Sequence, residues 1–140
     1  ELVKEAAKKI GVDEFIDKLP GKYDYDVKER GGMLSAGQRQ LMSFLRAYIT
    51  NPEILILDEA TSSVDTHTEE LIQNAIDVIT EGRTSIIIAH RLATIQKADK
   101  ILVLDKGEVM EEGTHHELLA KKGYYAKLYD MQFNNEESAA

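Results

Sequence analysis

Two short runs of branched apolar residues constrain most strongly what this chain can fold into. Ile54–Leu57 ends on the acids Asp58-Glu59, and Thr84–Ala89 ends on His90. Neither run alternates apolar with polar residues, which is typical of strands buried on both faces of a parallel sheet. We therefore expect two inner strands whose polar ends lie at the carboxyl edge of the sheet, where ligands gather in α/β proteins.

Helical patterns precede, separate and follow these runs. Helices are predicted over residues 2–10, 13–19, 37–50, 66–80, 92–96, 114–121 and 124–133. Further strands are predicted at Ile101–Leu104 and Glu108–Met110, joined by a turn at Lys106-Gly107. Capping boxes are predicted for Thr66 with Glu69 and for Thr114 with Glu117. Alternating strands and helices indicate an α/β fold, a parallel sheet flanked by helices.

Composition excludes several classes of function. A chain of 140 residues suffices for one domain with a core. Its net charge of -8 argues against nucleic-acid binding through a basic face. Without cysteine it has no disulfide, thiolate metal site or Cys nucleophile. No apolar run approaches the roughly 20 residues that span a bilayer. Because it begins at Glu1 rather than Met, we expect a processed product or a piece of something longer.

The acids after the first run are candidates for metal binding and catalysis. An Asp at the carboxyl end of a strand, here Asp58, can hold Mg²⁺ while waters complete the octahedron. A second acid beside it, Glu59, can polarise a water for attack on a phosphoryl group. Two acids after a strand are as often a solvated turn, so this pattern alone leaves both interpretations open.

Ser35 and the histidines also have plain structural alternatives. Leu34–Gln38 places small residues at a helix start, whose N–H groups can bind an anion, but Ser before a helix is also a common N-cap. His90 is able to contact a transferring phosphate, although a single His after a strand is more often a polar terminus. The other histidines lack the spacing of a metal site and are predicted to lie at the surface: His67, His115 and His116.

The occurrence of these motifs together, in one order, favours the functional interpretation. LSAGQRQ is followed by ILILDEATSSVD and then by IIIAHRLATIQKADKILVLDKGEVMEEGTHHELL. This series closely resembles the nucleotide-binding domain of ATP-binding cassette (ABC) transporters, over nearly the whole chain. The resemblance implies a partial P-loop NTPase fold, with ATP and Mg²⁺ as the ligands of the full-length protein.

The resemblance implies a role for each matching residue. Asp58 is similar to the Walker B acid that supports Mg²⁺, through water, and Glu59 to the catalytic glutamate that positions the attacking water. His90 resembles the switch histidine near the γ-phosphate. The signature motif, which faces ATP held by the opposite subunit, corresponds to Ser35, Ala36, Gly37 and Gln38. The D-loop, which crosses the dimer interface, corresponds to Ser62, Ser63, Val64 and Asp65.

The resemblance also implies partners and a location. A second nucleotide-binding domain, identical or different, completes the ATP sites. The loop Glu29-Arg30-Gly31 resembles the segment that touches the transmembrane domain of the same transporter, which places this domain at the cytoplasmic face of the cell membrane. Ala60 and Arg91, with GTHHELL, favour the exporter branch, because importers more often carry Pro and Asp at those two positions. No nucleic-acid partner is implied.

One motif of the family is missing. Its phosphate loop requires G-x-x-x-x-G-K-[ST] after a strand, and no such segment occurs here. The resemblance places the P-loop strand between Thr84–Ala89 and Ile101–Leu104, so the sheet would have a gap and unpaired edges. We therefore expect the isolated chain to be inactive as an ATPase, to bind ATP weakly at most, and not to be stable as a native monomer.

The family pattern leaves further points open. Residues 1–50 would end the helical and signature subdomain, 51–123 would run from Walker B through the switch His, and 124–140 would be a C-terminal helix and tail. Ala36 stands where the family most often has Gly, and its methyl group would crowd a close approach to phosphate. The alternatives are a soluble ABC-type ATPase of DNA repair or chromosome maintenance and a non-enzymatic regulatory fragment. The acidic charge and the loop at Glu29-Arg30-Gly31 favour the exporter.

Overall fold

The computed structural model describes residues 1–59 and 64–134 and divides the chain into two compact units, Glu1–Ile88 and Ala89–Ala140. The first unit opens with α1 (Leu2–Ile10) and α2 (Asp13–Asp17), where helices are predicted. Gly11 ends α1 at φ 81°, a left-handed conformation that glycine adopts at little cost. Residues 21–33, between the second and third predicted helices, contain two short 3₁₀ turns, η1 (Lys22–Asp24) and η2 (Glu29–Gly31).

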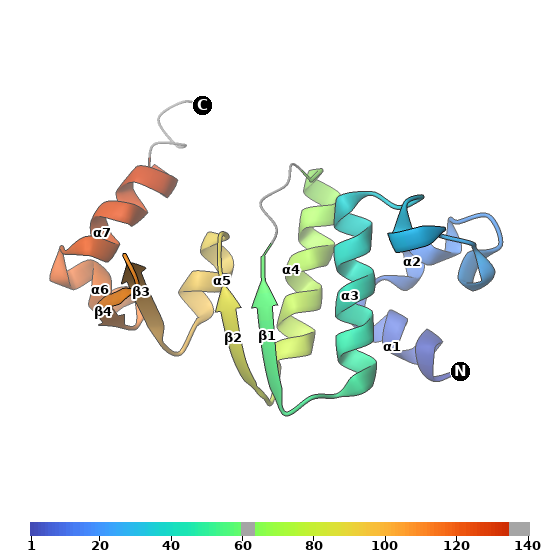
Figure 1. The fold of residues 1–140 in the computed structure, drawn as a ribbon, viewed down its shortest axis with the longest axis horizontal. Helices are drawn as coiled ribbons and strands as arrows, with labels where there is room; N and C mark the ends of the chain where they lie inside the picture. The colour runs from blue at the N-terminus through green and yellow to red at the C-terminus, as the bar shows by residue number, and fades with distance from the viewer. Residues whose placement is uncertain (60–63, 135–140) are drawn as a thin grey trace. The chain divides into compact units, whose positions relative to one another are not determined.

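Two long helices and a pair of strands form the centre of the first unit. α3 (Ala36–Thr50), β1 (Ile54–Asp58), α4 (Thr66–Thr80) and β2 (Thr84–Ile88) all match the predicted ranges to within a residue or so. The strands pair in parallel, with Ile56 opposite Ile86. Figure 1 shows α3 and α4 lying side by side, and both begin at the end of the unit where the strands finish. The predicted α/β arrangement with a parallel sheet is confirmed.

The core of the first unit lies between these helices and one face of the sheet. Ile72, Ala75 and Ile79 are fully buried because their helical spacing puts them on one stripe of α4. The other elements contribute further buried apolar side chains to the same cluster: Ala6, Ala7 and Ile10 of α1, Leu41, Phe44 and Leu45 of α3, and Leu55 and Leu57 of β1.

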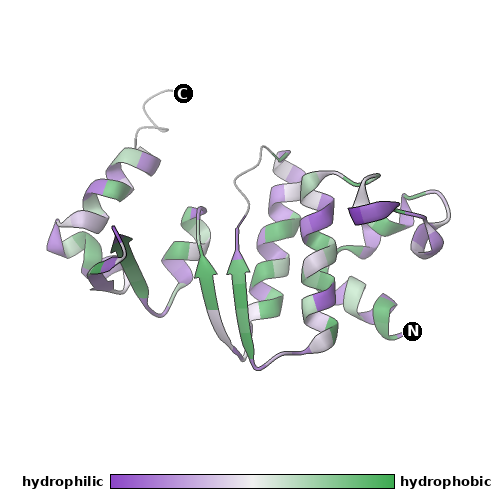
Figure 2. Ribbon diagram, in the orientation of Figure 1, coloured by the Kyte–Doolittle hydropathy of each residue, from purple (hydrophilic) through white to green (hydrophobic). Residues whose placement is uncertain are grey.

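The opposite face of the β1–β2 sheet is uncovered, so the prediction that both runs are buried on both faces is wrong. Ile54 and Ile56 are 62% and 71% exposed, and Ile86 and Ile88 are 57% and 54% exposed. They share one face because side chains alternate along a strand and the register aligns the two strands. Strands of this apolar composition are usually buried on both faces of a sheet, whereas the described helices of this unit cover only one face. We call these four side chains the isoleucine face, which lies on the apolar strands of Figure 2.

The second unit is built around an antiparallel hairpin. α5 (Leu92–Lys97) leads to β3 (Ile101–Asp105), which pairs with β4 (Glu108–Gly113) across the predicted turn. α6 (His115–Lys121) and α7 (Tyr124–Tyr129) contact β4, and a small core forms from Val103, Leu118 and Tyr125. The helix predicted over residues 124–133 instead widens after Tyr129 into a π-helical turn, η3 (Asp130–Asn134).

One of the two predicted capping boxes is present. The Thr114 hydroxyl accepts a hydrogen bond from the Glu117 N–H at 3.3 Å, and the Glu117 carboxylate accepts one from the Thr114 N–H at 2.8 Å. The box predicted for Thr66 and Glu69 is wrong. Helix α4 begins at Thr66, which leaves Asp65 in the N-cap position, and the Asp65 carboxylate accepts from the Thr68 N–H.

The strands described form two separate sheets, β1–β2 and β3–β4, and β2 does not pair with β3. This is the position at which the family resemblance places the P-loop strand. Among residues 1–59 and 64–134, no helix has both the length and the apolar character needed to cross a bilayer.

Candidate functional site

The candidate site lies at the edge of the first unit where β1 and β2 finish and where α3 and α4 begin (Figure 1). Asp58 is the last residue of β1, and its side chain is exposed. Glu59 follows it and is only 3% exposed, while its N–H donates to the Ile88 carbonyl at 3.1 Å. Buried carboxylates are rare outside functional or paired positions. The two acids therefore occupy different environments, one open to solvent and one enclosed.

Ser35 caps helix α3, as the structural alternative predicts. Its hydroxyl accepts from the Gln38 N–H at 3.2 Å, and the Gln38 side-chain carbonyl accepts from the Ser35 N–H at 3.0 Å. This capping box satisfies two N–H groups at the helix start. Ser35 and Ala36 remain exposed at the positive end of the helix dipole, which suits an anion. Contact of Ser35, Ala36 or Gln38 with a phosphate stays a prediction.

Gly37 is buried where α3 passes α4. A Cβ atom built on it would lie 2.6 Å from the Thr68 Cγ2 and 3.0 Å from the Val64 Cγ1. Such distances leave no room for a methyl group. The sequence reasoning gave Gly37 a role toward phosphate and missed this packing role. A glycine in the first turn of a long amphipathic helix is the signal that indicates a close helix approach.

Asp65 caps the start of α4. Its Oδ1 accepts from the Thr68 N–H at 2.9 Å, and its Oδ2 accepts from the Thr68 hydroxyl at 2.7 Å. These bonds, the hydroxyl's first, hold the pKa of Asp65 below its ordinary value. Ser62 and Ser63 of the predicted D-loop, and Ala60, lie outside the described residues. The role of Asp65 at a dimer interface stays a prediction.

Two further predicted contributors are His90 and the turn at Glu29-Arg30-Gly31. His90 is exposed and belongs to the second unit, so its proximity to Glu59 stays a prediction. Glu29 and Arg30 are exposed in η2, where Arg30 has a positive φ, as does Lys28 just before the turn. These exposed side chains are accessible to a partner, and the contact of Glu29-Arg30-Gly31 with a transmembrane domain stays a prediction.

Asp58 fits part of a Mg²⁺ site rather than a whole one. It offers an exposed carboxylate at a strand end, where a hydrated Mg²⁺ can be held. In the part of the chain that the structure describes, no group of three or more His, Cys, Asp or Glu side chains converges as a metal site. The sequence also lacks the phosphate loop.

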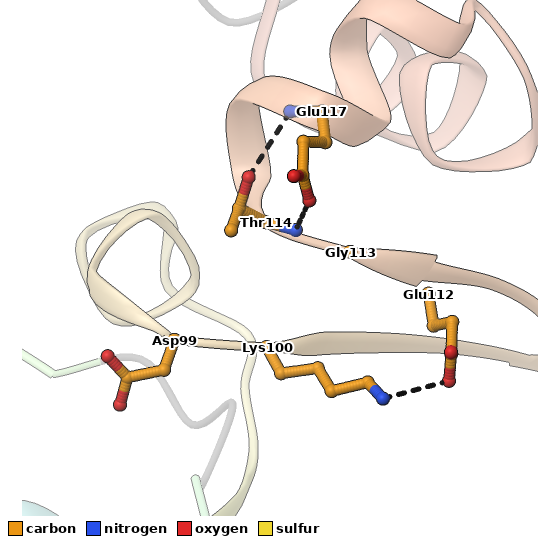
Figure 3. Close-up of a pocket in the computed structure, with 6 residues that line it drawn as sticks. All are labelled: Asp99, Lys100, Glu112, Gly113, Thr114 and Glu117. Carbon is orange, nitrogen blue, oxygen red and sulfur yellow. Dashed lines mark hydrogen bonds and ion pairs between the residues drawn. The ribbon is translucent and has the colours of Figure 1, made fainter.

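A shallow hollow in the second unit does not compete with this edge as a site. It is lined by Asp99, Lys100, Glu112, Gly113, Thr114 and Glu117 (Figure 3). The Lys100 ammonium pairs with the Glu112 carboxylate at 3.0 Å, and Glu117 is used by the capping box. Lys100 and Glu112 thus bond to each other and Glu117 bonds to the backbone, which is typical of a structural cluster.

His115 is buried, which corrects its predicted place at the surface. It is 5% exposed, and its Nδ1 lies 2.7 Å from the Tyr125 hydroxyl. Burial, and after it the neighbouring His116, lowers the pKa of His115. The sequence hides this because the burial depends on α7 packing over α6, a tertiary contact.

Comparison with known proteins shows which domain this chain is similar to. The ABC transporter family profile matches residues 1–62. The chain is 50% identical over 140 residues to the "Probable multidrug resistance ABC transporter ATP-binding/permease protein YheH" of Bacillus subtilis (strain 168), covering all of this chain and 21% of that protein. It is 54% identical over 134 residues to an "Uncharacterized ABC transporter ATP-binding protein YknV" of the same organism, covering 96% and 22%. A solved bacterial Atm1-family ABC exporter with ATP bound superposes with a TM-score of 0.81 and 44% identity, over 94% of this chain and 23% of that one.

The chain is similar to part of an ABC transporter ATP-binding domain. It spans about a fifth of the length of the curated relatives it matches, which carry ATP-binding or ATP-binding/permease names. The edge where β1 and β2 end carries Asp58, Glu59 and Ser35, to which the ABC resemblance gives roles, and these roles stay predictions. Because the identity is high over nearly the whole chain, the roles of the matching residues in the ABC family are reasonable hypotheses for this chain.

Proposed function

We propose that this chain supplies the Walker B and signature part of the ATPase of an ABC exporter, working within a longer polypeptide. The observation that carries the proposal is the pair at the end of β1, an exposed Asp58 beside an enclosed Glu59, at the edge where α3 begins with Ser35. The match to exporter ATP-binding proteins supports it. The chemistry is ATP hydrolysis coupled to transport across a membrane.

Each residue has a distinct task in this proposal. Asp58 would hold Mg²⁺ through water, and the metal, when bound, would neutralise charge on the phosphates. Glu59 orients the attacking water and accepts its proton, a task that enclosure from bulk solvent favours. His90 contacts the γ-phosphate. The signature residues Ser35, Ala36, Gly37 and Gln38, together with Asp65, serve the nucleotide of the partner subunit.

The proposal includes two partners and a location. A second nucleotide-binding domain closes the site against the exposed start of α3. A transmembrane domain, fused as in the relatives named ATP-binding/permease, contacts the Glu29-Arg30-Gly31 turn, in which Glu29 and Arg30 are exposed. The domain then works at the cytoplasmic face of the membrane. The names of the relatives favour this over a soluble ABC-type ATPase of DNA repair.

Replacing Glu59 tests the proposed function. In the longer polypeptide, Glu59→Gln keeps the size of the side chain but removes the base, so hydrolysis is expected to fall by about 10²-fold or more while ATP binding persists. Glu53→Gln is the matched control, because Glu53 is an exposed acid just before β1. ATP turnover and retention of labelled ATP are measured for both. Unchanged turnover in Glu59→Gln would overturn the assigned role.

A further inference from the structure

Thr68 joins the start of α4 to its cap through two hydrogen bonds. Its N–H donates to the Asp65 Oδ1 at 2.9 Å, and its hydroxyl donates to the Asp65 Oδ2 at 2.7 Å. Thr is β-branched, so its χ1 angle has few alternatives in a helix. The hydroxyl bond selects one of them and thereby fixes the direction of the Cγ2 methyl group.

That methyl group points at the backbone of Gly37 on the neighbouring helix. A Cβ on Gly37 would lie 2.6 Å from the Thr68 Cγ2, closer than two carbon atoms approach without displacement. Thr68 cannot rotate away without giving up its hydroxyl bond to Asp65. At Gly37 the first turn of α3 therefore meets the first turn of α4 most closely through the Thr68 side chain, with the Val64 Cγ1 next to it.

We propose that Thr68 is a positioning residue that sets the spacing between the signature turn at Ser35–Gln38 and the D-loop residue Asp65. Its hydroxyl holds the Asp65 carboxylate, and its methyl group sets how closely α3 approaches. Gly37 is required on this account because the methyl group of Thr68 occupies the place of a side chain. The functional consequence rests on the function proposed above, in which both segments face the partner subunit.

The test is a rescue experiment in the longer polypeptide. Gly37→Ala forces the Thr68 methyl group aside and is expected to lower kcat/KM for ATP by about tenfold or more, since small displacements of positioning groups have effects of this size. Thr68→Ser removes that methyl group and keeps the hydroxyl, so the double variant is expected to regain activity over Gly37→Ala. Recovery should be incomplete because the Val64 Cγ1 also lies 3.0 Å from the added atom.

Two further variants separate the contacts. Thr68→Val keeps a methyl group and loses the hydroxyl bond to Asp65, and is expected to raise KM for ATP severalfold. Thr80→Ser, at the far end of α4, is the control partner for Gly37→Ala, because the Thr80 hydroxyl bonds to the Ile76 carbonyl and touches neither segment. It should give no recovery.

Melting temperatures of the same variants separate this inference from the proposed function. If Glu59→Gln leaves ATP turnover unchanged, the function fails, yet Thr68→Ser should still restore the melting temperature lost in Gly37→Ala. A double variant no better than Gly37→Ala in both readouts would overturn the inference. Recovery of the melting temperature without recovery of kcat/KM, in a polypeptide whose turnover depends on Glu59, would equally overturn the positioning role.

Discussion

The isoleucine face gives the sharpest prediction, because one substitution should act differently in two contexts. Ile56 is 71% exposed in this chain. Full burial of such a side chain stabilises by about 1.5–3 kcal/mol, so covering its exposed part contributes roughly 1–2 kcal/mol. If the rest of the domain covers this face, Ile56→Thr should lower the unfolding free energy of the longer polypeptide by that amount. Thr retains the β-branched shape that suits a strand.

In the isolated chain the same substitution should be beneficial, because it should reduce self-association. There the face is open, and with unpaired strand edges it favours self-association. Ile56→Thr, alone and with Ile86→Thr, should therefore reduce association measured by light scattering and sedimentation. Leu55→Thr is the control, because Leu55 is 5% exposed on the covered face and should destabilise in both contexts.

Two results would refute this reasoning. One is a longer polypeptide whose urea denaturation is unaffected by Ile56→Thr, since the face would then remain open. The other is an isolated chain that is monomeric and melts cooperatively with the isoleucines intact. The latter would also refute the prediction that the chain alone is not stable as a native monomer.

Three further predictions concern activity, a cap and pH. The isolated chain should show no ATP turnover and little heat of ATP binding by calorimetry, because it has no phosphate loop; turnover abolished by Glu59→Gln would contradict this. In the longer polypeptide, Asp65→Ala should lower the melting temperature by roughly 2–4 °C. Because the folded-state pKa of Asp65 is lowered, the stabilisation by its carboxylate is present above about pH 4 and is lost as the pH falls through the folded-state pKa. A melting-temperature difference between wild type and Asp65→Ala that persists at lower pH would contradict this. Because the pKa of His115 is lowered, the second unit should be most stable above about pH 6.5 and should lose stability as the pH falls through the folded-state pKa. Amide hydrogen exchange near Tyr125 should report this loss. The variant His115→Gln should remove the pH dependence, whereas His67→Gln, at an exposed histidine, should leave it unchanged.

The sequence predicted the elements well because their signals are local. Helix α4 begins and ends where predicted, and the Thr114–Glu117 box forms, since periodicity and caps involve neighbouring residues only. The uncovered side of Ile54 and Ile56 was not predictable from the run itself, because burial depends on what packs against the sheet.

The site was predicted in part for the same reason. Asp58 and Glu59 follow β1 as expected, because strand ends are readable from the apolar run. The contact between Gly37 and Thr68 joins residues about thirty positions apart, and no local pattern encodes it. The place of His90 relative to Glu59 depends on how the two units assemble, which sequence spacing alone does not fix.

The account rests on Glu59 serving an ATP site whose phosphate loop lies elsewhere in the polypeptide. The most direct measurement is ATP turnover by the B. subtilis protein YheH with its matching 140 residues replaced by this chain. We predict turnover within about tenfold of unaltered YheH, and its loss, with ATP still bound, on Glu59→Gln in the replaced segment. A chimera that binds ATP and hydrolyses it equally well with Gln at position 59 would contradict the account.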